Sequence, residues 1–146
     1  MNVQPMEILL VEDNEDDILL EQEALAEAKL VNLMHVVRDG EEAIAYLKRQ
    51  GPYTRARRPG LILLDINMPK KNGFEVLRDI KSDPDLMHIP VVMLTTSASE
   101  ADVVKSYAGG ACSFITKPMD FDKLREVAAQ FSIYWALVAR VPSAAG

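Results

Sequence analysis

Short, almost purely apolar runs, separated by amphipathic stretches, restrict the fold of this sequence more than any other feature. The apolar runs predict strands at residues 6–11, 33–37, 61–64, 91–94 and 112–116. Helical spacing of apolar residues follows each run, at residues 16–28, 39–47, 74–82, 99–107 and from 120 to about 139. Strands that are apolar throughout are typical of a parallel sheet buried on both faces. The alternation therefore predicts an α/β fold, with helices covering both sides of a five-stranded parallel sheet.

Length and composition indicate one domain. The chain has 146 residues, of which 49% are hydrophobic, and this is enough for a core of its own. We expect a single domain over residues 1–146, with a core from about 6 to 139 and a flexible tail at 140–146. The single cysteine excludes an internal disulfide.

The charge balance argues against nucleic acid as a partner. The formal net charge is −6, and a negative body repels a polyanion. The basic cluster Arg55, Arg57 and Arg58 lies in a predicted loop at 51–60 and is short, so we interpret it as a solvated loop. No apolar run approaches the roughly 18 residues that a membrane span needs. The N-terminus does not read as a signal peptide, so a cytoplasmic location is expected, without membrane or nucleic-acid binding.

Polar side chains follow four of the predicted strands. Glu12 and Asp13 follow the first strand, Asp65 ends the third, Thr95 ends the fourth and Lys117 follows the fifth. Ligands of open parallel sheets bind at the carboxyl ends of the strands, so these side chains are expected to meet at one edge. Clustered carboxylates repel one another and need a cation, for which Mg²⁺ is suited because it prefers oxygen ligands. A carboxylate at the tip of a buried strand can also act as a nucleophile toward phosphorus.

Four motifs in order carry a family resemblance. They are Val11-Glu12-Asp13-Asn14, the run from Leu64 to Gly73 (LDINMPKKNG), Met93-Leu94-Thr95 and Thr116-Lys117-Pro118. Over about residues 6–139 the chain resembles the receiver domains of two-component response regulators. The resemblance implies a flavodoxin-like three-layer sandwich with strand order 2-1-3-4-5.

The resemblance also implies a metal site and a phosphoacceptor. Asp65 is similar to the family's phosphoacceptor aspartate. Glu12 and Asp13 match its metal-binding acidic pair, and Asn67 stands where the family supplies a backbone carbonyl to the ion. We expect Mg²⁺ to be bound there by Glu12, Asp13, Asp65 and the Asn67 carbonyl, with Mn²⁺ or Ca²⁺ able to substitute in crystals.

Further residues match the family's switch. Thr95 is similar to the switch hydroxyl, and Lys117 to the lysine that contacts the phosphoryl group. Phe114 occupies the place of the switch aromatic, although a core position explains it equally well. The resemblance implies a cis bond between Lys117 and Pro118.

The function implied is that of a phosphoacceptor which takes its phosphoryl group from a histidine kinase. Such a protein catalyses only its own phosphorylation and dephosphorylation and is otherwise not an enzyme. No output domain is expected, so the signal would pass through changed protein contacts or onward phosphotransfer. Loop 51–60, the 83–90 stretch, Leu94 to Ser97 and an aromatic-rich last helix also resemble small regulators paired with phytochrome-type histidine kinases.

The last predicted helix is apolar on more than one side. Phe131, Tyr134, Trp135 and Val138 extend its apolar surface beyond a single core-facing stripe. We therefore hypothesise a homodimer through this helix, because aromatic side chains of that size favour partner contacts. The alternative is that these side chains fold back over the domain's own core.

Two other functions are compatible with parts of the pattern. A degenerate receiver would bind partners without phosphorylation, but such a protein usually lacks the acceptor or the lysine. A haloacid-dehalogenase-type phosphohydrolase also forms an aspartyl-phosphate. It needs an acid two residues after the nucleophile, where this chain has Asn67.

Overall fold

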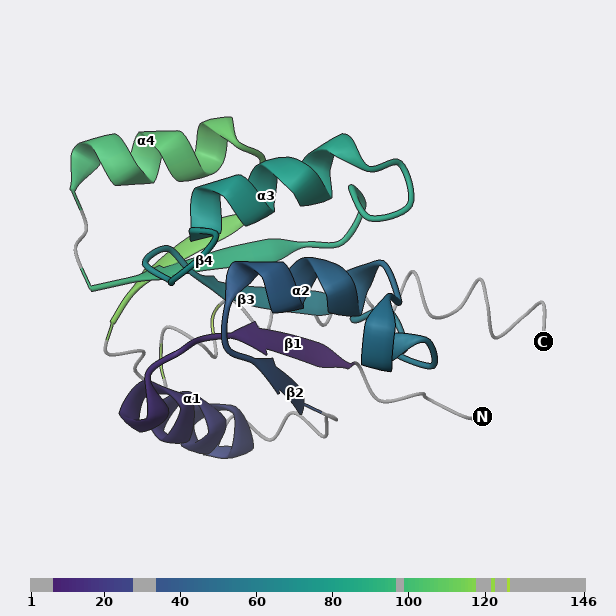
Figure 1. Ribbon diagram of the computed structural model, residues 1–146. Coiled ribbons are helices and arrows are strands. Elements are labelled where there is room, and N and C mark those ends of the chain that lie inside the picture. The colour runs from purple at the N-terminus through teal and green to yellow at the C-terminus, as the bar shows by residue number, and fades with distance from the viewer. Residues whose placement is uncertain (1–6, 28–33, 97–98, 118–121, 123–125, 127–146) are drawn as a thin grey trace, which may run out of the picture.

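The computed structural model describes residues 7–27, 34–96, 99–117, 122 and 126 of the chain. Its centre is a parallel sheet of five strands in the order β2-β1-β3-β4-β5 (Figure 1). The strands are β1 Ile8–Val11, β2 Met34–Val37, β3 Leu61–Asp65, β4 Val91–Thr95 and β5 Ser113–Thr116. The predicted sheet, its parallel direction and its strand order are therefore confirmed.

Helices cover both faces of the sheet. They are α1 Glu15–Glu27, α2 Gly40–Leu47, α3 Gly73–Ser82 and α4 Glu100–Ala108, with a short 3-10 turn η1 at Gly51–Tyr53. Helices α2, α3 and α4 lie on one side of the sheet and α1 lies on the other (Figure 1). This is the predicted three-layer arrangement.

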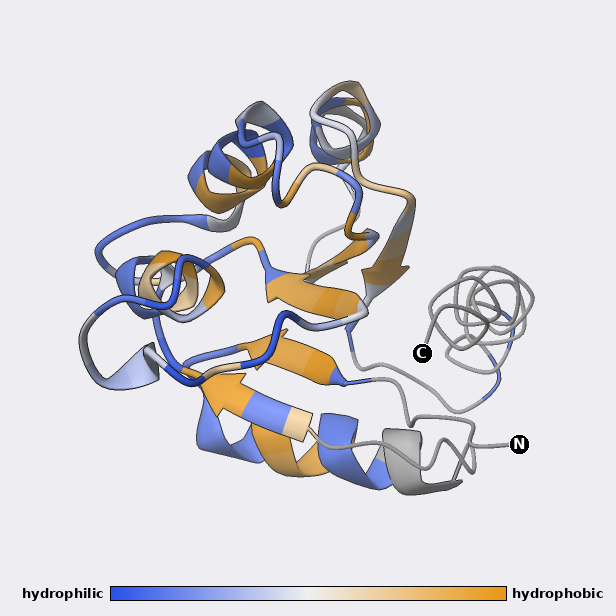
Figure 2. Ribbon diagram, turned by 90° about the vertical axis from the view of Figure 1, so that its right-hand side faces the viewer, coloured by the Kyte–Doolittle hydropathy of each residue, from blue (hydrophilic) through white to orange (hydrophobic). Residues whose placement is uncertain are grey.

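Alternation along the strands divides the core in two. Leu9, Ile62, Leu64 and Met93 point to the side of α2 and α3, while Leu10, Leu63 and Leu94 point to the side of α1. Each of these side chains is completely buried. The central strands are hydrophobic throughout (Figure 2), because successive side chains of a strand enter opposite cores.

Side-chain caps begin α2, α3 and α4, and the caps of α2 and α4 stand at the predicted helix starts, residues 39 and 99. Asp39 accepts a hydrogen bond from the Glu42 amide at 2.8 Å, and Ser99 accepts one from the Asp102 amide at 3.1 Å. Asn72 and Glu75 form a reciprocal capping box at the start of α3. These caps satisfy backbone donors that the first turn of a helix leaves free.

Close backbone packing fixes the start of α3 beneath the third strand. The Gly73 amide donates to the Ile66 carbonyl at 2.8 Å, and a Cβ on Gly73 would lie 2.7 Å from the Ile66 Cα and closer still to the Asp65 carbonyl oxygen. Lys70, in the preceding turn, has a positive φ of 66°. Glycine at 73 therefore lets the turn return directly below Asp65.

Three predictions fall on residues outside the described part of the chain. They are the cis bond to Pro118, the flexible tail at 140–146, and the last helix from 120 to about 139 with its proposed dimer surface at Phe131, Tyr134, Trp135 and Val138. The residues that are described contain no helix long and apolar enough to cross a membrane.

Candidate functional site

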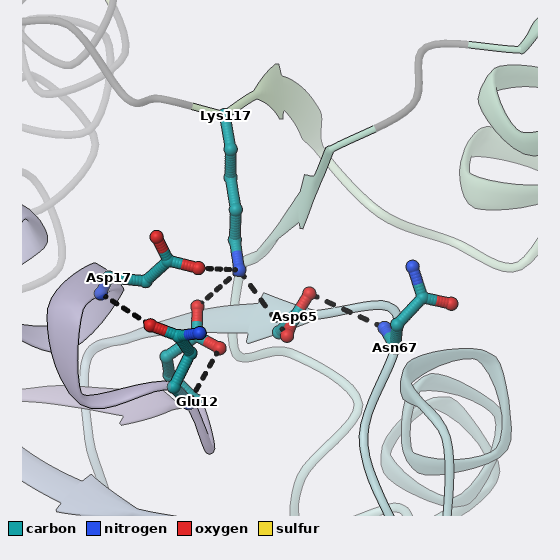
Figure 3. A network of polar contacts seen from close by, with 6 residues as sticks. Glu12, Asp17, Asp65, Asn67 and Lys117 are labelled. Atoms are coloured by element: carbon teal, nitrogen blue, oxygen red, sulfur yellow. Dashed lines mark hydrogen bonds and ion pairs between the residues drawn. The ribbon is translucent and has the colours of Figure 1, made fainter.

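The predicted site residues meet at the carboxyl edge of the sheet. Glu12 and Asp13 directly follow β1, and Asp65 is the last residue of β3. Lys117 follows β5, and its side chain reaches back across the edge toward Glu12 and Asp65 (Figure 3). Parallel pairing of β1 with β3, of β3 with β4 and of β4 with β5 brings these strand ends together.

Lys117 is the cation of this cluster. Its Nζ forms an ion pair with Glu12 Oε1, lies 3.1 Å from Asp17 Oδ2 and lies 3.3 Å from Asp65 Oδ2 (Figure 3). The side chains of Glu12, Asp65 and Lys117 are 0%, 6% and 6% exposed. One ammonium group therefore offsets only part of the negative charge of carboxylates that water hardly reaches.

Burial and neighbouring charges shift the pKa values of Asp65 and Lys117. Loss of hydration and the neighbouring Glu12 raise the pKa of Asp65 to about 7, against an opposing effect of Lys117. Burial lowers the pKa of Lys117, but hydrogen bonding and attraction from Glu12 and Asp65 outweigh it and the net shift is upward. Lys117 therefore stays charged, whereas Asp65 exchanges its proton close to neutral pH.

The acidic residues fit a divalent cation. One oxygen each of Glu12, Asp13 and Asp65 can be chosen so that all three lie within 4.8 Å of one another. Glu12 and Asp65 are buried, whereas Asp13 is exposed, so the group opens toward solvent on one side. Oxygen donors in such a group suit Mg²⁺ or Mn²⁺, both of which keep water or phosphate in their remaining positions.

Three predicted residues border this group. The Asn67 amide donates to Asp65 Oδ1 at 3.3 Å and so orients the carboxylate (Figure 3). Thr95 is completely buried at the end of β4, and its carbonyl accepts a hydrogen bond from the Lys117 amide at 2.6 Å. Phe114 is half-buried in β5 and packs against the core on the side of α2 and α3.

Sequence reasoning missed two acidic residues of α1. Asp17 lies in the first turn of the helix and contacts Lys117, although the sequence alone indicates a solvated acidic run there. Glu21 lies one turn further and is only 2% exposed. Among the described residues its carboxylate oxygens have no hydrogen-bond partner. Its pKa is raised to about 9 by burial and by Glu12. The spacing of Asp17 and Glu21 is the available signal, because residues four apart lie on the same face of a helix.

Comparison with known proteins identifies the class. The response regulator receiver domain family matches residues 8–129. The chain therefore belongs to the response regulator receiver domain family, and it is a response regulator whose partner class is a histidine kinase.

Particular relatives narrow the comparison. The chain is 43% identical over 140 residues to the response regulator Rcp1 of Synechocystis sp.. The aligned region covers 96% of this chain and 95% of Rcp1. The crystal structure of the phosphorylated cyanobacterial phytochrome response regulator RcpA is 47% identical, with a TM-score of 0.78. The superposed region covers 91% of this chain and 95% of the RcpA chain. The Mn²⁺-bound form of Rcp1 is 44% identical with a TM-score of 0.76, over 90% and 94% of the two chains.

Proposed function

We propose that this response regulator accepts a phosphoryl group on Asp65 from a phosphohistidine of its kinase. Asp65 stands at the rigid tip of a buried strand, beside an ammonium group and inside an acidic group that fits a divalent cation. This placement of Asp65 carries the proposal. Glu12, Asp13, Asp65 and the Asn67 carbonyl would hold Mg²⁺.

The chemistry requires an ionised Asp65. One carboxylate oxygen attacks the phosphorus, and the new O–P bond forms as the P–N bond of the phosphohistidine breaks. The bonding electron pair returns to the imidazole nitrogen, which leaves with the kinase. When bound, the divalent ion supplies positive charge against the phosphoryl oxygens. Lys117 stabilises the ionised carboxylate before the reaction and the phosphoryl oxygens after it.

Signalling would follow from a new dianionic group at this edge. A phosphoryl group on Asp65 competes with Glu12 and Asp17 for the Lys117 ammonium. Thr95 would offer its hydroxyl, and Phe114 would change its packing at the neighbouring β5 surface. The bond between Lys117 and Pro118 is proposed to be cis, as the family resemblance implies.

Phosphorylation by acetyl phosphate with Mg²⁺ tests the assignment. We expect intact-mass spectrometry to show the gain of one phosphoryl group, and we expect the gain to be lost in Asp65→Asn and after removal of divalent ions. A gain that survives Asp65→Asn would overturn the site. No gain from acetyl phosphate or from any kinase would indicate a receiver that binds partners without phosphorylation.

The kinase is proposed to be of the phytochrome type, because the similar solved structures include phytochrome and bacteriophytochrome response regulators. Phosphotransfer from a purified phytochrome-type kinase should be faster than from unrelated histidine kinases at equal concentration. Equal rates across kinases would contradict this pairing.

We also propose a homodimer that forms through residues 120–139. The cytoplasmic location is a separate prediction. Size-exclusion chromatography with light scattering at micromolar concentration measures the oligomeric state. We expect a dimer that Trp135→Ala weakens, and a monomer both before and after phosphorylation would contradict it.

A further inference from the structure

Positive charge gathers in one segment of this acidic chain. Five of its 16 Lys and Arg residues lie between Glu42 and Asp65, and none of its 22 Asp and Glu residues does. We call residues 48–60 the basic loop. Its five cations are all exposed, namely Lys48, Arg49, Arg55, Arg57 and Arg58. Of these cations, only Arg57 has a carboxylate of a described residue within ion-pair distance, Glu7 at 3.7 Å.

The basic loop is held by hydrogen bonds from its first residues onward. At the end of α2 the Arg49 amide donates to the Tyr46 carbonyl at 3.2 Å, and the Gln50 amide donates to the Ala45 carbonyl at 2.9 Å. Arg49 stands in the left-handed position of this C-cap, with φ 57°, where glycine is usual. Its Nε donates to the Ala56 carbonyl at 2.9 Å and so ties the start of the loop to a residue beyond its middle.

Aromatic rings support the basic loop from below. His35 stacks on Tyr46 with centroids 4.5 Å apart, and Tyr53 meets both rings edge-on. The Tyr53 hydroxyl donates to Glu42 Oε1 at 2.8 Å. These contacts fix the loop backbone, so a ligand would meet arginines whose starting positions are already ordered, which reduces the entropy lost on binding.

The basic loop lies at the edge of the sheet opposite the phosphorylation site. Helix α2 starts at the carboxyl edge after β2 and ends at the amino edge, where the loop leads into β3 (Figure 1). The Gly60 amide donates to the Glu7 carbonyl at 2.7 Å, beside the start of β1. A partner on the loop would therefore leave Asp65 open to the kinase.

The charge pattern favours a short anionic segment over an extended polyanion. Outside the loop the molecule is strongly acidic, so a nucleic acid or a membrane plane would run over surface that repels it. A short peptide would contact only the loop. Salt screens the repulsion from the acidic surface beyond about 8–10 Å, so that repulsion would hardly reach the peptide. The large exposed hydrophobics of the described residues, Leu19, Leu20, Met87, Val104 and Tyr107, lie outside the loop. None of these hydrophobic side chains could therefore insert into a membrane that lies against the basic loop. Four arginines suit carboxylates, which they bind in bidentate geometry.

We propose that the basic loop is a docking site for an acidic peptide segment of a partner protein. Arg55 and Arg58, which have no carboxylate of a described residue within ion-pair distance, form the main contacts, and Arg49 and Lys48 widen the positive surface. Binding there is independent of phosphotransfer, so the regulator can hold a partner while its kinase works on the opposite edge.

A labelled glutamate-rich peptide of about ten residues tests this in fluorescence anisotropy near physiological salt. The variant Arg55→Gln/Arg58→Gln should bind about tenfold more weakly than the unaltered protein, because it loses two guanidinium contacts. The matched control is Arg78→Gln/Lys105→Gln, which removes two exposed cations from α3 and α4 and changes the net charge equally. It should bind the peptide like the unaltered protein. Acetyl phosphate should phosphorylate all three proteins at equal rates, which shows that the fold and Asp65 are intact.

Several outcomes would overturn the proposal. Equal weakening by both double variants would show general electrostatic attraction and no site. Absence of peptide binding, or tighter binding to vesicles containing phosphatidylserine or to a single-stranded oligonucleotide, would exclude an acidic peptide as the preferred partner.

Discussion

Charged side chains are buried and paired at one edge of the sheet and exposed at the other. At the carboxyl edge, Glu12, Asp65 and Lys117 are almost completely buried and contact one another. At the amino edge, the cations of the basic loop are exposed, and the backbone beneath them is held by aromatic stacking and hydrogen bonds. Burial therefore shifts the pKa values of Asp65 and Lys117 at the first edge, whereas the second edge presents its charges to solvent on an ordered backbone.

This difference suits the carboxyl edge to chemistry and the amino edge to partner binding. Buried charges are costly unless they are paired, and removing one partner leaves the other without compensation. Such a cluster responds strongly to one added phosphoryl group or one cation. Exposed charges contribute little to stability individually and are free to meet a partner. Substitutions at the carboxyl edge should therefore change stability and chemistry together, while those in the basic loop should change little besides binding.

Removal of the buried cation should have the largest effect. Lys117→Met leaves Glu12, Asp17 and Asp65 without their ammonium, and we expect a loss of about 3–5 kcal/mol in the free energy of unfolding at pH 8. Urea denaturation measures it. Mn²⁺ should restore part of the loss, because a divalent ion replaces the missing positive charge. A variant as stable as the unaltered protein without metal would contradict the charge balance described here.

A side chain added at Gly73, below Asp65, should have the second largest effect on stability. Gly73→Ala places a methyl group against the backbone of Asp65 and Ile66, and we expect a loss of about 2–3 kcal/mol with slower phosphorylation by acetyl phosphate. Gly109→Ala is the control, because its nearest neighbour is the movable tip of Leu77 at 2.8 Å. Equal losses in the two variants would show that the backbone below Asp65 gives way easily.

Glu21 should lower the stability of the unaltered protein as the pH rises. Its pKa is raised from 4.5 to about 9 on folding, so the folded state binds the proton more tightly than the unfolded state. Stability from this group is complete below pH 4.5 and decreases until about pH 9. Glu21→Gln should therefore stabilise the protein by about 1–3 kcal/mol at pH 8 and by much less at pH 5. Thermal unfolding across this range, without metal, measures the difference, and a gain that does not depend on pH would contradict a buried neutral carboxyl.

The smallest effect is expected at the amino edge. Arg49→Gly relieves the left-handed backbone at the end of α2 and should add up to about 1 kcal/mol of stability, less what the lost hydrogen bond to Ala56 contributed. It should leave phosphorylation unchanged. Chemical denaturation measures the change, and a destabilised variant would show that the tie across the loop outweighs the backbone strain.

Much of the fold could be predicted because local signals agree with it. The apolar runs give the strands, and Asp39 and Ser99 mark helix starts by cap chemistry that needs only neighbouring residues. The strand-end positions of Glu12, Asp65 and Thr95 follow from the same runs. Asp17 and Glu21 could not be assigned in this way, because in the sequence they belong to a helix that is acidic on several sides.

The sequence by itself determined the strands, most of the helix ends and the polar side chains that close each strand, because these depend on residues a few positions apart. Only the tertiary structure decided that Lys117 contacts Glu12 and Asp17, which lie 105 and 100 positions away, and that Glu21 is buried behind them. Strand pairing and the packing of α1 against the sheet set those distances, and with them the loss of hydration that raises the pKa of Asp65 and of Glu21.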